Sequence, residues 1–552
     1  MKRNSLNLML LAGIVTFSIT SCKKNLILTP NNQISSEEVF STPLGYTEAM
    51  AKVYGSYATT GNIGPNNPSG SGDIQGVDEG TSDFWREFWN CEELTTDEAV
   101  ITYTDPGVQD LHNMVWDANN QISQGLYYRS LYQITLCNNF LQQSTPALVA
   151  SHGITGADAT NIANYALEAR FLRAYQYWVL MDVFGNPPFA TETFKIGSGI
   201  PPQTTRKALY AYIVGELKAI ETLLPAPNKN LYGRVDQGAV WALLARVYLN
   251  AGVYTGTADY TDAITYCNKL ISSNAYGLIP NYQNLMLANN NLNTIPGGGS
   301  TSEFILTINY DGVKSNGYGG SQYMTFAEVG GSMPVTKFGI SGGYAGMRTT
   351  SNLLNLFPAN ATTDGSQFPS NGNPDTRAEF WYPGQTTGIA SLTTFTNGIP
   401  SCKFRDVTSN GTPTSSESFT DMDLPLFRLP EIYLIYAEAT LRGGSGGDLT
   451  TALGYINLIR TRAYGGSTAG NLTSTAQLTL QFILDERSRE LYWEGFRRTD
   501  LIRYGTFTGS NYLWPWKGGV AAGTGVASYR NLFPLPSTDL AANPNLKQNT
   551  GY

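Results

Sequence analysis

Hydrophobic residues recur every three to four positions along much of the chain, which is the spacing of amphipathic helices. This pattern predicts helices over residues 44–58, 125–143, 157–184, 206–224, 237–250, 259–272, 428–441, 450–463 and 479–504. A short apolar run at 303–310 predicts one strand. Residues 81–110 mix aromatic and acidic side chains and predict irregular structure, and residues 531–552 predict an extended tail. The expected fold class is therefore mainly α.

Two of the predicted helical hairpins resemble each other. The second helix of each contains Ala-x-x-Tyr-x-Asn, at residues 263–268 and again at 452–457. Small residues spaced about one turn apart let neighbouring helices approach closely, and helix pairs of roughly 34 residues with this character are tetratricopeptide-like. The pairs do not follow a fixed period, so we expect an interrupted array with long loop-rich excursions and a few short strands.

The largest interruption is rich in glycine, asparagine and tyrosine. Loops of this length inside a domain are usually functional or disordered, and the aromatic content argues against disorder. We therefore divide the chain into a signal peptide at 1–21, an N-terminal helical half at 22–274, a loop-rich excursion at 275–426 and a C-terminal helical half with its tail at 427–552. The excursion is the expected ligand face.

The N-terminus has the build of a secretory signal. A basic start, Met1-Lys2-Arg3, precedes an apolar stretch at 6–19 and then the small residues before Cys22. The apolar stretch is shorter than the roughly 20 residues of a transmembrane helix. A cysteine at the cleavage point indicates a bacterial lipoprotein whose Cys22 carries acyl chains that anchor it to a membrane. The alternative is an ordinary signal peptide with an incidental cysteine.

Composition narrows the possible chemistry. Net charge is −8 and no long basic run occurs, which disfavours nucleic acid as a partner. Only two histidines occur and no CxxC spacing exists, which argues against a His-based metal site or catalytic triad. No catalytic residue, metal ligand or cofactor is assigned, and the sequence does not say whether a calcium ion stiffens the loops. The remaining cysteines are predicted to be buried free thiols, although an exported protein could oxidise a pair: Cys91, Cys137, Cys267 and Cys402.

Tyrosine is abundant, with 33 residues in a chain of only 14% charged residues. Tyrosine offers a flat apolar face and a hydrogen-bonding tip. This composition suits the binding of neutral polar ligands such as sugars, although most individual rings are expected to belong to the core.

The densest charged segment carries Glu486, Glu490 and Glu494 on one helix face. One hypothesis is a carboxylate pair of a glycoside hydrolase, which makes a lipoprotein glycosidase the rival function. The other is an ion-pair ladder that fixes the helix to its neighbours. Every acid here has an arginine within four residues, which favours the structural interpretation. The G-x-S-x-G match at residues 443–447 lies between helices and lacks the strand of a nucleophile elbow.

Several segments, in order, resemble the RagB/SusD family of outer-membrane nutrient-binding lipoproteins. They are the lipoprotein start at Cys22, Glu93-Leu-Thr-Thr-Asp-Glu98, residues 167–186, residues 427–439, residues 486–503 and the tail at 543–552. Together they span nearly the whole chain. The segment 497–503, with 512–518, is similar to the branch that contains starch binders.

The resemblance implies a fold of four interrupted tetratricopeptide-like helix pairs and glycan binding without catalysis. It also implies a SusC-like, TonB-dependent outer-membrane transporter as partner and a surface-exposed location on the cell outer membrane. Arg86 and Tyr103 are the candidate glycan-binding residues beside the Thr-Asp-Glu segment. Further stacking rings are expected from the excursion, where the candidates chosen by region are Tyr310, Tyr318, Tyr323 and Tyr344.

A third hypothesis is a pure assembly scaffold, because tetratricopeptide arrays often bind peptides. Aromatic side chains gathered on the excursion, rather than in a concave helix groove, would disfavour it. The sequence does not name the glycan.

Overall fold

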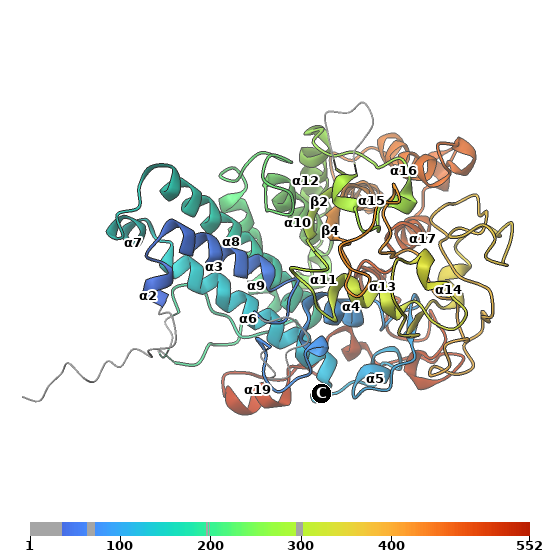
Figure 1. The fold of residues 1–552 in the computed structure, drawn as a ribbon, viewed down its shortest axis with the longest axis horizontal. Coiled ribbons are helices and arrows are strands. Elements are labelled where there is room, and N and C mark those ends of the chain that lie inside the picture. The colour runs from blue at the N-terminus through green and yellow to red at the C-terminus, as the bar shows by residue number, and fades with distance from the viewer. Residues whose placement is uncertain (1–35, 63–71, 195–196, 198, 294–301) are drawn as a thin grey trace, which may run out of the picture.

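Packed helix pairs form the framework of the molecule (Figure 1). The computed structural model describes residues 36–62, 72–194, 197, 199–293 and 302–552. In the view of Figure 1, the long helices between residues 43 and 220 lie at the left, and the loops of the excursion lie at the right beside the helices between residues 429 and 491. The predicted fold class, mainly α with interrupted tetratricopeptide-like pairs, is confirmed.

The N-terminal half is the more regular part. Its helices are α2 (Ser36–Val39), α3 (Pro43–Gly55), α4 (Phe84–Glu92), α5 (Val108–His112), α6 (Gln121–Gln143), α7 (Pro146–Ser151), α8 (Gly156–Val183), α9 (Arg206–Ile220), α10 (Gln237–Leu249), α11 (Ala251–Thr255) and α12 (Tyr260–Ser272). The C-terminal part contains α15 (Leu429–Leu441), α16 (Leu449–Ala463), α17 (Leu480–Leu491), α18 (Arg497–Arg503) and α19 (Ser537–Ala542).

The two similar hairpins are the pairs α10–α12 and α15–α16, and they pack against each other through α12 and α15. Aspartate side chains cap the helices, as when Asp236 accepts from Ala239 N at 3.1 Å at the start of α10. Tyr433 of α15 stacks on Tyr455 of α16 with ring centroids 4.8 Å apart. The Gly-rich run at 443–447 is the loop between α15 and α16, as predicted.

The excursion contains α13 (Gly320–Ala327) and α14 (Ser351–Leu354) among long loops. Two small antiparallel sheets tie it to both helical halves. Strand β1 (Val100–Ile101) pairs with β3 (Met347–Arg348), and β2 (Phe304–Ile308) pairs with β4 (Leu424–Arg428). The excursion is therefore held from the N-terminal side by β1 and from the C-terminal side by β4.

The prediction of irregular structure over 81–110 is wrong in part. Helix α4 occupies residues 84–92, and the Asp83 side chain caps it by accepting from Arg86 N. Helix α4 is only nine residues long, too short for its period to stand out, and its polar residues Glu87 and Asn90 are buried along with its apolar ones. The tail is also not wholly extended, because α19 lies within it.

The continuous helix predicted over 479–504 is broken. Helix α17 ends at Leu491, Trp493 has a positive φ of 64°, and α18 begins at Arg497. The break is fixed from outside, because the buried Glu93 carboxylate accepts from the backbone N–H groups of Gly495 and Phe496. Local periodicity cannot reveal such a tertiary contact.

The four cysteines beyond residue 22 are buried and free, as predicted. Within the part of the chain that the structure describes, no helix combines the length and apolar character needed to cross a membrane. Cys22 and the signal segment lie outside the described residues. The proposed boundaries after residues 274 and 426 stay predictions.

Candidate functional site: an aromatic face beside Arg86

Helices α4 and α13 meet end to end through one aspartate. Asp83 Oδ1 accepts from Arg86 N and from Gly320 N, both at 2.9 Å. Asp83 thus caps α4 and also holds the first residue of α13. This contact joins segments more than 200 residues apart and places the side chains of both helices on one surface.

The Arg86 guanidinium lies over the ring of Tyr323, 4.9 Å from its centroid. Tyr323 is only 2% exposed, and its hydroxyl donates to Asn90 Oδ1 at 2.9 Å. Its ring therefore supports Arg86 from below instead of offering an open surface. Arg86 Nε has no hydrogen-bond partner among the described residues.

Tyr103 follows β1 and packs beside this pair. Thr102 N donates to Gly346 O at 3.0 Å. This bond extends the β1–β3 pairing to the residue just before Tyr103. Gly346 permits the approach, because a Cβ there would lie 2.6 Å from Tyr103 Cζ. The ring is half-buried, burial raises the pKa of the phenol, and the phenol oxygen has no hydrogen-bond partner among the described residues.

Tyr344 provides an open ring on the same surface. It is 42% exposed, although its backbone N–H is fixed to Phe326 O at 2.8 Å. Its ring rests against that of Phe326 with centroids 5.1 Å apart. Gln322 Nε2 donates to the Tyr344 hydroxyl at 3.2 Å. Gln322 Oε1 is left without a partner in the described structure.

The remaining two candidates flank this group. Tyr318 is 38% exposed, contacts Phe419 at 5.7 Å between centroids and lies within electrostatic reach of Tyr344. Tyr310 is half-buried, with its phenol oxygen against the backbone of Gly320. We call the set Arg86, Tyr103, Tyr318, Tyr323 and Tyr344 the aromatic face, with Tyr310 beneath it.

The structure thus brings the six predicted side chains together and shows that they differ in exposure. Tyr318 and Tyr344 are open, Arg86 and Tyr103 lie at the base, and Tyr323 and Tyr310 support the others. Open rings can bury the flat apolar side of a ligand. The partly exposed side chain of Arg86 can donate hydrogen bonds to its hydroxyls. This chemistry fits a neutral polyhydroxylated ligand.

Sequence reasoning missed Gln322, Asp83 and Asn90. An aspartate before an aromatic run is an N-cap signal that could have found Asp83. Gln322 lies in an eight-residue helix after two glycines, too short for a clear period. Asn90 is on α4, a nine-residue helix in a stretch that was predicted to be irregular.

A cavity of about 610 Å³ lies elsewhere, near the C-terminus. It is lined by Asn186, Gln203 and Asn549, whose side-chain amides already bond to the chain. Its polar groups therefore hold the tail in place.

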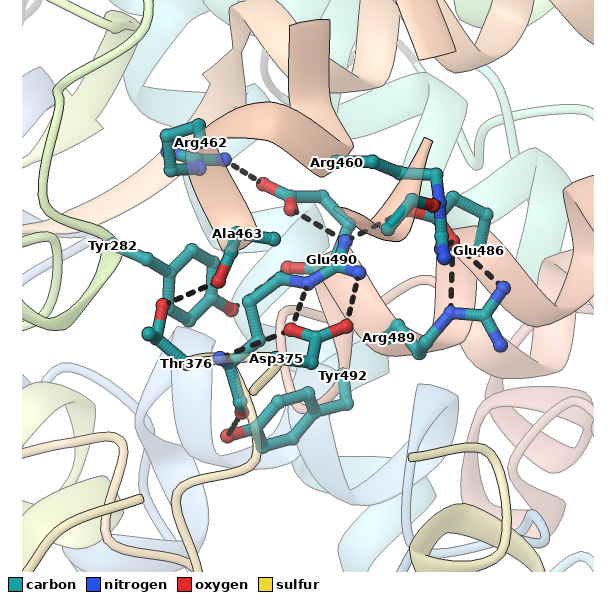
Figure 2. Close-up of polar contacts among 12 residues, drawn as sticks. Tyr282, Asp375, Thr376, Arg460, Arg462, Ala463, Glu486, Arg489, Glu490 and Tyr492 are labelled. Atoms are coloured by element: carbon teal, nitrogen blue, oxygen red, sulfur yellow. Dashed lines mark hydrogen bonds and ion pairs between the residues drawn. The ribbon is translucent and has the colours of Figure 1, made fainter. Parts of the chain in front are cut away.

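Glu486 and Glu490 of the charged segment form ion pairs with basic side chains (Figure 2). Glu490 accepts from Arg377, Arg428 and Arg462, and Glu486 accepts from Arg377, Arg460 and Arg489. Burial would raise the pKa of Glu490, but the three arginines outweigh it and lower the pKa to about 2. A carboxyl that stays ionised cannot act as the general acid of a glycosidase.

Comparison with known proteins gives the class of this molecule. Residues 359–552 match a family model described as the SusD family, and residues 73–249 match one described as "starch-binding associating with outer membrane". The chain is 35% identical to the starch-binding protein SusD of Bacteroides thetaiotaomicron over 98% of both chains. It is also 25% identical to the SusD-like protein P38 of Formosa agariphila, over 70% of this chain and 74% of that one.

The chain therefore belongs to the SusD family, as its motifs predicted. Solved structures share the fold. A surface glycan-binding protein A from Bacteroides fluxus superposes with a TM-score of 0.66 at 20% identity, covering 93% of this chain and all of that one. The corresponding Bacteroides thetaiotaomicron protein, solved with laminarihexaose, gives 0.63 at 21% identity, covering 91% and 98%. The family is one of binding proteins, so the expectation of a non-catalytic chain is confirmed.

Proposed function

We propose that this protein is a surface-exposed outer-membrane lipoprotein that binds an oligosaccharide on the aromatic face and delivers it to a TonB-dependent transporter. The observation that carries the proposal is the pair of open rings, Tyr318 and Tyr344, beside the partly exposed side chain of Arg86. Starch and glycan binding by relatives of similar length supports it. The family model that matches residues 73–249 is described as associating with the outer membrane, which also supports the proposal.

The ligand claim is tested by calorimetry of the purified protein with maltoheptaose, laminarihexaose and other oligosaccharides. We expect binding of at least one, with no sugar released in a parallel product assay. Binding of none would contradict the proposal. Release of sugar that is lost when one acid is substituted would instead support the glycosidase.

The anchor claim rests on Cys22 at the end of the signal segment. We expect Cys22→Ala to release the protein from outer membranes into the soluble fraction, because it removes the acyl chains. A variant that stays with the membrane after a high-salt wash would show that another element anchors it.

The transporter claim rests on membership of the SusD family and the implied place at the outer membrane. An affinity tag on the C-terminus, followed by gentle detergent extraction, should co-purify a large outer-membrane barrel protein with a TonB-box sequence. Purification of the tagged protein alone, with and without cross-linker, would argue against a stable partner.

A further inference from the structure

Gln322 lies behind the aromatic face and contacts one of its two open rings. It belongs to α13 and is only 3% exposed, so a ligand that covers the face does not reach it. Its Nε2 donates to the Tyr344 hydroxyl at 3.2 Å and to Ser418 O at 2.9 Å. One buried amide therefore contacts both the tip of an open ring and the loop beside that ring.

The contact with the loop fixes the direction of the contact with the ring. A backbone carbonyl only accepts hydrogen bonds, so Ser418 O requires the nitrogen of the Gln322 amide, and the same nitrogen faces the Tyr344 hydroxyl. The phenol oxygen is therefore the acceptor. Its own O–H has no acceptor among the described residues, and Tyr344 is 42% exposed. The phenol hydrogen is thus left for a ligand oxygen.

The backbone of Tyr344 is held by contacts that do not involve Gln322. Tyr344 N donates to Phe326 O and Ala345 N donates to Val329 O, both at 2.8 Å. These bonds fix the main chain against the end of α13. In the described structure, the tip of the Tyr344 side chain is held by the Gln322 amide. Loss of the amide should therefore free the side chain and leave the main chain in place.

The loop that Gln322 contacts has a second attachment to α13. Ser321 Oγ and Thr420 Oγ1 share a hydrogen bond of 2.7 Å. The same loop carries Phe419, whose ring centroid lies 5.7 Å from that of Tyr318. This second attachment keeps the loop, and with it the support of the other open ring, in place when the amide is lost.

Resting on the proposed function, we propose that Gln322 is a positioning residue for oligosaccharide binding, which holds the Tyr344 ring against the sugar and directs its O–H toward a ligand oxygen. A ring whose tip is already fixed loses less conformational freedom on binding than a free one. The directed O–H also favours a ligand that presents an acceptor oxygen beside this ring. Gln322 acts on the ligand through Tyr344 alone.

A double-mutant cycle tests this proposal, with dissociation constants measured by calorimetry for maltoheptaose, laminarihexaose or whichever other oligosaccharide the wild type binds most tightly. Gln322→Met keeps an unbranched side chain without the amide, and Tyr344→Phe keeps the ring without the hydroxyl. Each change should raise the dissociation constant about threefold, the effect of one lost hydrogen bond. Together they should also raise it about threefold instead of about ninefold, because the amide has no hydroxyl to act on in Tyr344→Phe.

The matched control is Ser321→Ala on the same helix. It removes a hydrogen bond to the same loop, and Ser321 has no hydrogen bond to Tyr344 among the described residues. Any effect of Ser321→Ala should add to that of Tyr344→Phe. If a lowered melting temperature shows that Gln322→Met does not fold, Gln322→Leu takes its place in the cycle.

Three results distinguish the proposals. Additive losses for the Gln322 and Tyr344 changes, or wild-type affinity in the Gln322 variant, overturn the positioning role and leave the proposed function standing. Equal coupling of Ser321→Ala to Tyr344→Phe also overturns the positioning role, because the effect would then belong to α13 as a whole. Absence of binding by the wild type overturns both proposals.

Discussion

Two regions of this molecule place arginines beside glutamates and use them in opposite ways. In the charge cluster of Glu303, Glu486, Glu490 and Glu494, every carboxylate oxygen accepts from a basic side chain. On the aromatic face, Arg86 Nε and Glu87 Oε1 lie 3.7 Å apart and neither has a hydrogen-bond partner among the described residues.

The two regions differ in how completely their buried polar groups are paired. Buried polar groups in stable cores are paired, because an unpaired one costs free energy. The carboxylates of the charge cluster follow this rule and join α17 to Arg377 of the excursion and Arg428 before α15. The aromatic face departs from it at Arg86, Tyr103 and Gln322. These unpaired atoms are buried, as is Trp89 Nε1 in the core, so the part of the aromatic face that a ligand can reach is its open rings, Tyr318 and Tyr344.

The largest expected effect comes from breaking the charge cluster. Glu490→Ala leaves three buried arginines without this partner, so we expect the free energy of unfolding to fall by about 3–5 kcal/mol. Urea denaturation measures it. Asp485→Ala on the same helix is the control, because that carboxylate bonds only Gln481 in the described structure and should cost far less. Equal losses for the two variants would contradict the cluster's role.

Acid should weaken the same cluster. The pKa of Glu490 is about 2 when folded, below the value of about 4.3 in an unfolded chain. Its stabilising contribution is therefore complete above about pH 4.3 and is lost as the pH falls toward 2. Urea denaturation at pH 5 and pH 3 should show a larger loss for the wild type than for Glu490→Gln, which cannot ionise. Parallel losses would mean that other carboxyls dominate.

On the aromatic face, Arg86→Ala should leave the fold intact and weaken oligosaccharide binding. A hydrogen bond to a charged group contributes about 1.5–3 kcal/mol, which corresponds to roughly tenfold to a hundredfold in the dissociation constant. Arg170→Ala removes an arginine paired with Glu216 on the N-terminal helices and serves as the control. Similar affinity for both variants would remove Arg86 from the site.

Sequence patterns predicted the parts of this molecule that local rules determine. The long helices follow from periodicity. Ion pairs were expected for the acids of the charged segment, but with arginines within four residues, whereas Glu490 pairs with Arg377, Arg428 and Arg462 of other elements. Helix α4 was missed because its nine residues are too few for a clear period, and the break after α17 was missed because the Glu93 carboxylate fixes it from another part of the chain.

The assembly of the candidate site also depends on tertiary contacts that local sequence patterns do not predict. Arg86 and Tyr103 were chosen from the family resemblance, on either side of the Thr-Asp-Glu segment, and Tyr344 from its region. Their assembly depends on Asp83 binding the start of α13, a contact across 237 residues that no local pattern contains. For the same reason, the support of Arg86 by Tyr323 and the position of Glu87 beneath it could only be read from the structure.

The most direct test of the account compares two tyrosines of nearly equal exposure. Tyr344 on the aromatic face is 42% exposed, and Tyr232, which borders a separate cavity, is 41% exposed. We predict by calorimetry that Tyr344→Ala raises the dissociation constant for the oligosaccharide about tenfold, or roughly 1.4 kcal/mol, with an unchanged melting temperature, and that Tyr232→Ala leaves it unchanged. Unchanged affinity in Tyr344→Ala, or an equal loss in Tyr232→Ala, would contradict the claim that the aromatic face binds the ligand.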